Sequence, residues 1–415
     1  MPKKLMKAIR EHALPLDETS IGRLVEEAGE ADLVLLGEAS HGTAEFFELR
    51  AELSKRLIRE KGFTVVAVEG DWPSAQQVNR YVRGLSAYSS AGAMLKASFV
   101  RWPEWMWANR EAEHFLQWMR EENRTRADGE KAGFYGLDLY SLYESIDEVL
   151  GFLESRPSYG VDLNKARKAF SCFEPYNRMP EHYALSAARL TDECIGEVAD
   201  LLASIRVREE RDGNGTEGDL DLKMNALVAK NAEEYYRSML QDDAVSWNIR
   251  DTHMAEVAAG LIDHHGNGTK VIIWAHNTHV GDASETSMNR DGMINLGQLV
   301  RERYGKDRVF ALGFGTYAGS VIAAEEWGLP FERMTVPPAK LGTWEGQCHA
   351  ALGDDGVLLF DEENRRLFSG WTGHRAIGVV YNPEFEAYGN FVSSRVGQRY
   401  DGFVFFNRTE ALHPL

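Results

Sequence analysis

The sequence predicts an α/β protein with a mainly parallel sheet flanked by helices and with a helical insertion domain. Seven short runs are apolar throughout, as is typical of strands buried on both faces, and most are separated by long helical patterns. From residue 141 to residue 266 the strand pattern disappears, and helical patterns interrupted by prolines replace it. We therefore expect an α/β core formed by residues 1–140 and 267–415, and an α-helical insertion at residues 141–266.

The apolar runs define the expected strands. In chain order they are Leu33–Leu36, Thr64–Val68, Gly133–Leu137, Val271–Trp274, Val309–Leu312, Val357–Phe360 and Phe403–Phe406. The run 313-GFGTYAG-319 after the fifth strand resembles a dinucleotide-binding loop only loosely. Its spacing is GxGxxxG, and the residues that follow do not open a clear helix, so we expect no nucleotide cofactor there.

The helix expected after the first strand has recognisable ends. Thr43 is placed to cap its N-terminus, and Gly62 follows its last residues. Its apolar residues recur at spacings of three and four, which gives the helix one face to pack against the sheet. These residues are Phe46, Leu49, Leu53 and Leu57.

The last helix of the expected insertion spans residues 245–265 and is followed by Gly266. Its apolar residues also fall on one face. His264 and His265 lie at its end, where a helix C-terminus favours cations and a glycine favours termination. We therefore interpret the two histidines as capping residues and not as metal ligands.

The charge composition excludes some classes of partner. The chain has 64 acidic and 46 basic residues and a net charge of −18. Such a chain repels phosphodiesters, so we expect neither a nucleic-acid partner nor binding to anionic membranes. No apolar run approaches the roughly 20 residues needed to span a bilayer. The N-terminus is basic but lacks the apolar stretch of a signal peptide, so we expect a cytoplasmic protein.

The three cysteines are Cys172, Cys194 and Cys348. They form no CxxC pair, and an odd, sparse set is not a disulfide framework. We expect reduced residues of the core.

Ionisable residues follow four of the predicted strands. In a parallel α/β sheet, ligands bind at the carboxyl ends of the strands, so we expect these residues at one edge of the sheet. They are Glu38 and His41 after the first strand, Glu69 and Asp71 after the second, Asp138 after the third, and His276 and His279 after the fourth. Four such endings, with three histidines, favour a shared site over coincidence.

Arg50 lies two turns into the helix that begins just after His41. If its side chain faces the sheet edge, it could pair with Glu38 or Glu69. If it faces outward, it is an ordinary solvated arginine. The spacing alone does not decide between the two.

Several familiar catalytic motifs are missing from the sequence. There is no GxSxG, no HExxH and no cluster of cysteines and histidines. One interpretation is that His41 acts as a general base on water, with Glu38 or Glu69 orienting it. In that case His276, His279 or Arg50 could stabilise an oxyanion.

Two other interpretations stay open at this point. His41, His276, His279 and a carboxylate could bind a metal ion, because the HxxH spacing places two imidazoles close together on a turn. Alternatively, the three histidines could be core or loop residues with satisfied hydrogen bonds and no joint role.

The same residues lie in stretches that resemble the erythromycin esterase family, some of whose members carry the label succinoglycan biosynthesis protein. The main stretches are LGEASHGTAEF with Arg50, VAVEGDWP and AHNTHVGD, joined by RWPEWMW, GFYGLDLYS, WNIRDTHM and HRAIGVVYNP. Each stretch is weak alone, but their order and spacing are specific, and they run through nearly the whole chain. Ser40 stands where the family motif often has threonine, which keeps the hydroxyl group.

The resemblance implies an α/β core with a helical insertion, and hydrolysis of a macrolide lactone ester by direct attack of water. It implies no covalent serine, no metal and no other cofactor. His41 matches the general base of the family, and Arg50 matches its arginine. The matching carboxylates are Glu38 and Glu69, and the later histidine pair is His276 and His279.

We therefore expect a metal-independent carboxylic ester hydrolase that acts on a macrolide lactone or a related small-molecule ester. Asp138 and Arg250 are expected to bind the substrate, with Arg250 near the start of the last insertion helix. We expect Trp102, Trp105 and Trp107 in the core and not in an apolar cleft. The alternatives are a metal-dependent hydrolase and a non-catalytic protein that holds a small ligand or haem.

Overall fold

The computed structural model describes residues 2–187, 193–212 and 215–415. The chain forms two compact units. The first consists of the residues up to Ala67, Val78–Phe134 and Gly268–Leu415, and the second of Val68–Gln77 and Tyr135–Asn267. A mainly parallel sheet with flanking helices confirms the predicted α/β fold. The predicted boundaries of the insertion, residues 141–266, stay a prediction.

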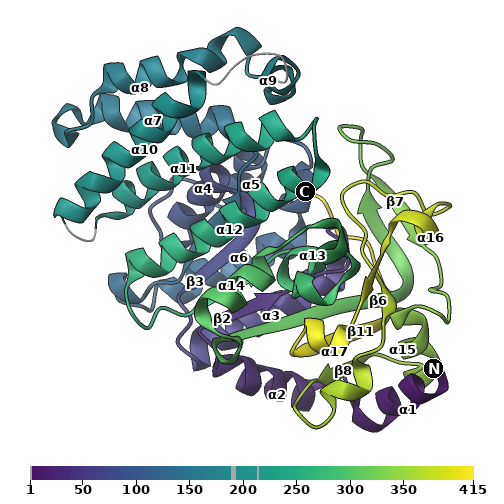
Figure 1. Cartoon of the computed structure of the whole chain (residues 1–415). Coiled ribbons are helices and arrows are strands. Elements are labelled where there is room, and N and C mark those ends of the chain that lie inside the picture. Colours follow the sequence, from purple (N-terminus) through teal and green to yellow (C-terminus); the bar gives the residue numbers. More distant parts are fainter. Residues whose placement is uncertain (1, 188–192, 213–214) are drawn as a thin grey trace. The chain divides into compact units, whose positions relative to one another are not determined.

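The main sheet has nine strands in the described part of the chain, in the order β1-β8-β11-β6-β2-β5-β3-β4, with β7 paired to β6. In Figure 1 the long strand β6 runs between β2 and β11. β2 is parallel to β5 and β6, and β11 is parallel to β6 and antiparallel to β8. The strands are β1 (Leu14–Pro15), β2 (Leu33–Leu36), β3 (Val65–Asp71), β4 (Gly133–Asp138), β5 (Val271–Trp274), β6 (Val309–Ala323), β7 (Glu332–Val336), β8 (Gly356–Leu359) and β11 (Gly402–Thr409).

All seven predicted strands are present. β2 and β5 have the predicted bounds, whereas β6 continues to Ala323 through the GFGTYAG run. Gly313 and Gly315 lie against the rings of Tyr400 and Phe403, where a Cβ would approach ring atoms to 2.8 Å. These two glycines therefore make room for aromatic rings on a strand, and they do not form a nucleotide-binding loop.

Among the described residues, four strands are not marked by apolar runs in the sequence. They are β1, β7 and the two strands of a separate sheet, β9 (Thr372–Arg375) and β10 (Phe391–Ser394). β1 has only two residues, and β7 is mostly exposed. β9 reads TGHR and β10 reads FVSS, so neither forms a continuous apolar run. A search for apolar runs finds only strands that are buried on both faces.

Helix α3 (Ala44–Glu60) has the predicted apolar face, which is buried. Burying each leucine or phenylalanine of that face contributes about 2 kcal/mol. Thr43 occupies the N-cap position without a side-chain capping hydrogen bond, and Gly62 beyond the helix has a φ of +75°.

Other helices of the first unit are α1 (Pro2–His12), α2 (Glu18–Gly29), α5 (Ala91–Ser98), α6 (Arg110–Asn123), α13 (Asn277–Val280), α14 (Leu296–Tyr304), α15 (Trp344–Leu352), α16 (Glu386–Gly389) and α17 (Val396–Arg399).

The second unit is mainly helical. Its longest helices, α11 (Glu217–Ser238) and α12 (Asp243–His265), pack side by side. α11 begins with a capping box formed by Thr216 and Asp219, and α12 begins at the N-cap Asp242. The remaining helices are α7 (Leu142–Ser155), α8 (Leu163–Phe170), α9 (Pro180–Ala187) and α10 (Glu193–Asp212), and α4 (Trp72–Val82) belongs in part to each unit.

The cysteines differ from the expectation. Cys172 is disulfide-bonded, so the prediction of a reduced thiol at that position is wrong. Cys348 is free and buried, as predicted, and burial raises the pKa of its thiol well above the usual value. The side chain of Cys194 lies outside the described residues.

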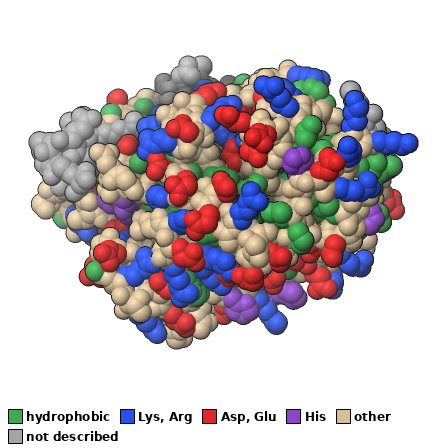
Figure 2. Space-filling view, turned by 90° about the horizontal axis from the view of Figure 1, so that it is seen from below, with side chains coloured by type: hydrophobic (Ala, Val, Ile, Leu, Met, Phe, Trp, Pro, Cys, Tyr) green, Lys and Arg blue, Asp and Glu red, His purple; other side chains and the backbone are tan. Residues whose placement is uncertain are grey.

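The surface carries charges of both signs. Figure 2 shows acidic and basic side chains interspersed over one face, with hydrophobic side chains scattered singly or in small groups between them. No helix of the described residues combines the length and the apolar character needed to cross a membrane. The excess of acidic residues is therefore spread among basic ones on this face and does not form a single-sign patch.

Candidate active site

The loop after β2 is tightly held by backbone contacts. Gly37 N donates to the carbonyl of Leu312 (2.9 Å), and Asn277 N donates to the carbonyl of Glu38 (2.8 Å). Gly42 lies so close to β6 that a Cβ there would meet the carbonyl oxygen of Ile322 at 1.9 Å. These contacts fix the turn that carries Glu38 and His41, both of which are buried.

One carboxylate joins the histidine and the arginine of this loop and helix. Oε1 of Glu38 lies 2.8 Å from His41 Nδ1, and Oε2 accepts from the guanidinium of Arg50 at 2.5 Å. Glu38, one of the two partners that the sequence allows for Arg50, is therefore paired with it in the structure. The arginine is only 1% exposed, and its guanidinium lies 4.4 Å from the ring centroid of Phe47 and 4.8 Å from that of Trp274. Its buried charge is offset by Glu38 and by the faces of two aromatic rings.

The hydrogen bonds fix different tautomers for the two nearest histidines. Glu38 accepts from His41 Nδ1, so the neutral imidazole of His41 carries its lone pair on Nε2. His276 Nδ1 instead accepts from the backbone N–H of Thr278 at 3.3 Å and lies 2.7 Å from the hydroxyl oxygen of the same residue. With Nδ1 as the acceptor of the backbone N–H, the neutral ring carries its proton on Nε2. The ring centroids of His41 and His276 are 5.0 Å apart. In the neutral state the ring of His41 therefore presents a lone pair on Nε2, and the ring of His276 presents an N–H group there.

His276 and His279 are positioned by a short helix that follows β5. His276 is the N-cap of α13, and His279 lies three residues later with a buried side chain. Between them, Asn277 donates from Nδ2 to the carbonyl of Phe314 (2.7 Å) and accepts from Phe314 N (3.2 Å). This pair of bonds ties α13 to β6.

A buried histidine that the sequence analysis does not single out supports Asn277. His374 Nε2 lies 3.2 Å from Asn277 Nδ2, and His374 Nδ1 lies 2.6 Å from Glu345 Oε1. Burial lowers the pKa of His374, against the opposing effect of the Glu345 hydrogen bond, so the ring is neutral at pH 7. The stretch HRAIGVVYNP contains His374, and that is the one signal in the sequence that could have found it.

Three further predicted residues meet in the second unit. Arg250 donates from Nε to Asp138 Oδ1 (2.9 Å) and from one terminal nitrogen to Asp138 Oδ2 (2.6 Å) and to Glu69 Oε1 (2.7 Å). Its guanidinium also lies 5.0 Å from the ring centroid of Tyr140. Arg250 is well inside α12, which begins at Asp243, and not near its start as expected.

The structure thus brings the predicted residues together in two clusters, one in each unit. The first cluster contains Glu38, His41, Arg50 and His276, with His279 in the same short helix as His276. The second cluster contains Glu69, Asp138 and Arg250.

The predicted tryptophans belong mostly to the core. Trp105 and Trp107 are buried, as expected. Trp102 is half-buried, and it donates to the carbonyl of Leu329 at 2.9 Å and packs on Trp327 with ring centroids 4.5 Å apart. None of these contacts indicates a substrate-binding role.

Comparison with known proteins identifies the family. The sequence pattern of erythromycin esterase matches residues 58–409. The chain belongs to the erythromycin esterase family. It is 26% identical to the erythromycin esterase type II of Escherichia coli over 71% of each chain, and 20% identical to the putative hydrolase YbfO of Bacillus subtilis (strain 168) over 95% of this chain and 89% of that protein. Membership of the erythromycin esterase family supports an activity of the esterase or hydrolase type and a small-molecule substrate.

Solved structures show the same fold. A succinoglycan biosynthesis protein aligns with a TM-score of 0.77 at 20% identity, over 100% of this chain and 99% of that chain. A mutant of the erythromycin esterase EreC in its open conformation aligns with a TM-score of 0.67 at 17% identity, over 95% of each chain. These likenesses extend the fold of the erythromycin esterase family to this chain.

Proposed function

We propose that this protein hydrolyses carboxylic esters by direct attack of water, with His41 as the general base. The observation that carries the proposal is the buried contact of Glu38 with His41 Nδ1, because it directs the lone pair of the imidazole to Nε2. Arg50 holds the other oxygen of the same carboxylate and so fixes its orientation.

The proposed reaction has two proton transfers. His41 Nε2 takes a proton from water while the water oxygen bonds to the ester carbonyl carbon. His276 donates a hydrogen bond from Nε2 to the resulting oxyanion. The tetrahedral intermediate then collapses, the bond to the alcohol oxygen breaks, and that oxygen takes a proton from the imidazolium of His41. His279 is proposed to bind the same reacting group.

The substrate in this proposal is a macrolide lactone or a related ester. Two findings support this class of substrate: the chain belongs to the erythromycin esterase family, and it is similar to the esterase of Escherichia coli. For Glu69, Asp138 and Arg250 we propose a role in binding the substrate. Arg250 and its two carboxylate partners together carry a net negative charge. This cluster therefore suits hydroxyl or amino groups of a ligand, and it would repel a carboxylate of the ligand.

The decisive experiment uses the full chain, treated with a chelator and incubated with a panel of macrolides and simple esters. Mass spectrometry should detect a product one water heavier than its substrate. The His41→Asn variant should form no product while its unfolding temperature stays close to that of the unchanged protein. Normal turnover by His41→Asn would overturn the proposal, and activity that disappears on chelation and returns with metal would favour a metal-dependent hydrolase.

A further inference from the structure

The open end of a helical hairpin in the second unit carries an unusual set of side chains. α11 and α12 are joined by only four residues, 239–242, and pack against each other, so they run antiparallel. The first residue of α11 therefore lies beside the last residues of α12. These residues are Glu217, His264 and His265. With 22 residues in α11, they lie about 33 Å from the connecting turn.

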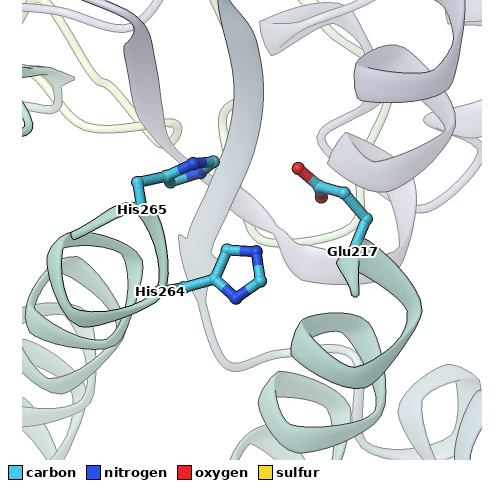
Figure 3. A group of neighbouring side chains, drawn as sticks. All are labelled: Glu217, His264 and His265. Carbon is cyan, nitrogen blue, oxygen red and sulfur yellow. The ribbon is translucent and has the colours of Figure 1, made fainter. Parts of the chain in front are cut away.

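The three side chains converge on one point. Each offers one ligand atom, and these atoms all lie within 4.8 Å of one another. Figure 3 shows that Glu217 points from one helix end toward His264 and His265 on the other. Donor atoms from the ends of the two helices therefore face one another.

A buried tyrosine holds part of this set in place. The hydroxyl of Tyr135, on β4, donates to Glu217 Oε1 at 3.0 Å and lies 3.0 Å from His265 Nε2. The tyrosine is fully buried, whereas Glu217 and His264 are half-buried and His265 is exposed. An ion could thus enter from solvent and meet a carboxylate that is already oriented.

The donor types define the kind of ion. Two imidazoles and one carboxylate suit a divalent first-row transition metal, and Zn²⁺ in particular accepts such a set with water in a fourth position. Mg²⁺ and Ca²⁺ prefer oxygen ligands alone. The C-terminal end of α12 adds partial negative charge beside the histidines, which favours a cation.

We propose that Glu217, His264 and His265 form a Zn²⁺ site that clamps the open end of the α11–α12 hairpin. The two histidines do lie at the end of α12, as their interpretation as capping residues requires, but they also face a carboxylate from another helix. The clamp is structural, and its ion takes no part in the proposed hydrolysis. Because α12 also carries Arg250, the ion would stabilise the helix that positions that residue.

The test is a calorimetric titration of the metal-stripped full chain with ZnCl₂, together with thermal unfolding. We expect one strong site and a rise in Tm of about 3 °C at saturating Zn²⁺. The variants His264→Ala, His265→Ala and Glu217→Gln should each weaken binding at least about tenfold. The Glu217→Gln variant is the most specific test of the three. Its amide oxygen can still accept from the hydroxyl of Tyr135, but the negative charge of the carboxylate that would bind the ion is lost.

Two controls decide where the ion binds. His114→Ala removes an exposed histidine of α6 in the first unit and should leave the titration unchanged. His41→Asn should also keep the strong site, which separates it from any metal bound by the residues of the proposed reaction. A chain that binds Zn²⁺ no more tightly than about 10 μM, or three ligand variants that bind like the unchanged protein, would overturn the proposal.

Discussion

At the scale of single residues, the geometry around Glu38 decides what His41 can do. The carboxylate lies against both His41 and Arg50, and all three side chains are buried. An imidazolium formed during turnover would be stabilised by the negative charge of Glu38. Arg50 holds the other carboxylate oxygen and so fixes the orientation of the group.

This arrangement predicts the effect of removing the charge of Glu38 while keeping its shape. In Glu38→Gln the amide can still accept from His41, but it no longer stabilises the imidazolium, so kcat should fall roughly 100-fold or more. KM should change much less. Steady-state kinetics on the ester identified by mass spectrometry measures both. Glu48→Gln, an exposed residue of α3, is the matched control and should change neither.

The sequence singles out Glu38 and His41 because both follow the end of one buried strand, whereas its spacing does not decide which way Arg50 faces. The contact of Arg50 with Glu38 is seen only in the structure. The sequence does not identify Asn277 as an anchor or His374 as its support, because these two side chains are 97 residues apart and no periodicity connects them. In the same way, no local pattern can predict the ion pair of Glu69 and Arg250, because the two are separated by 181 positions in the sequence.

At the scale of elements, glycines decide how closely the loop after β2 approaches β6. The backbone of Gly42 accepts from Ile322 N at 3.0 Å and from Leu412 N at 2.9 Å. There is no space for a side chain on that side of the loop.

The buried strands are predictable from the sequence because a continuous apolar run indicates burial on both faces. The short polar strands β9 and β10 contain no such run.

A pair of glycine substitutions tests this packing. In Gly42→Ala the new Cβ would meet backbone atoms of β6, so the free energy of unfolding should fall by about 2 kcal/mol or more. In Gly22→Ala, on α2, a Cβ meets nothing within 4 Å, and alanine should leave stability unchanged or raise it by up to about 1 kcal/mol. Urea unfolding of both variants gives the comparison. A similar effect of the two substitutions would contradict the packing described for the loop.

At the scale of the whole molecule, each unit contains a buried histidine with a lowered pKa. Burial lowers the pKa of His253, in the second unit, from 6.5 to about 4, and it also lowers that of His374, in the first unit. Below pH 6.5 the unfolded chain therefore binds protons at these positions that the folded chain does not bind. Stability should fall as the pH falls through this range.

The pH dependence has a specific size for His253. Between pH 6.5 and about 4 this residue should remove about 3 kcal/mol from the free energy of unfolding. His253→Gln keeps an acceptor for Asn231, whose Nδ2 lies 3.0 Å from His253 Nδ1. This variant should reduce the slope of the free energy of unfolding against pH by the equivalent of nearly one bound proton. The exposed His114→Gln should leave it unchanged. Urea unfolding at a series of pH values measures the slopes, and equal slopes for the two variants would contradict the role of His253.

The hydrogen bond from Asn277 N to the carbonyl of Glu38 has a consequence for how new specificities could arise. It joins the two histidine-bearing loops through main-chain atoms, which every amino acid except proline supplies at the donor position. Side chains elsewhere in the fold can therefore change over generations without altering the spacing between the imidazoles of His41 and His276. In the proposed mechanism this main-chain bond would therefore keep the base and its neighbour in place while substitutions elsewhere change which ester is bound.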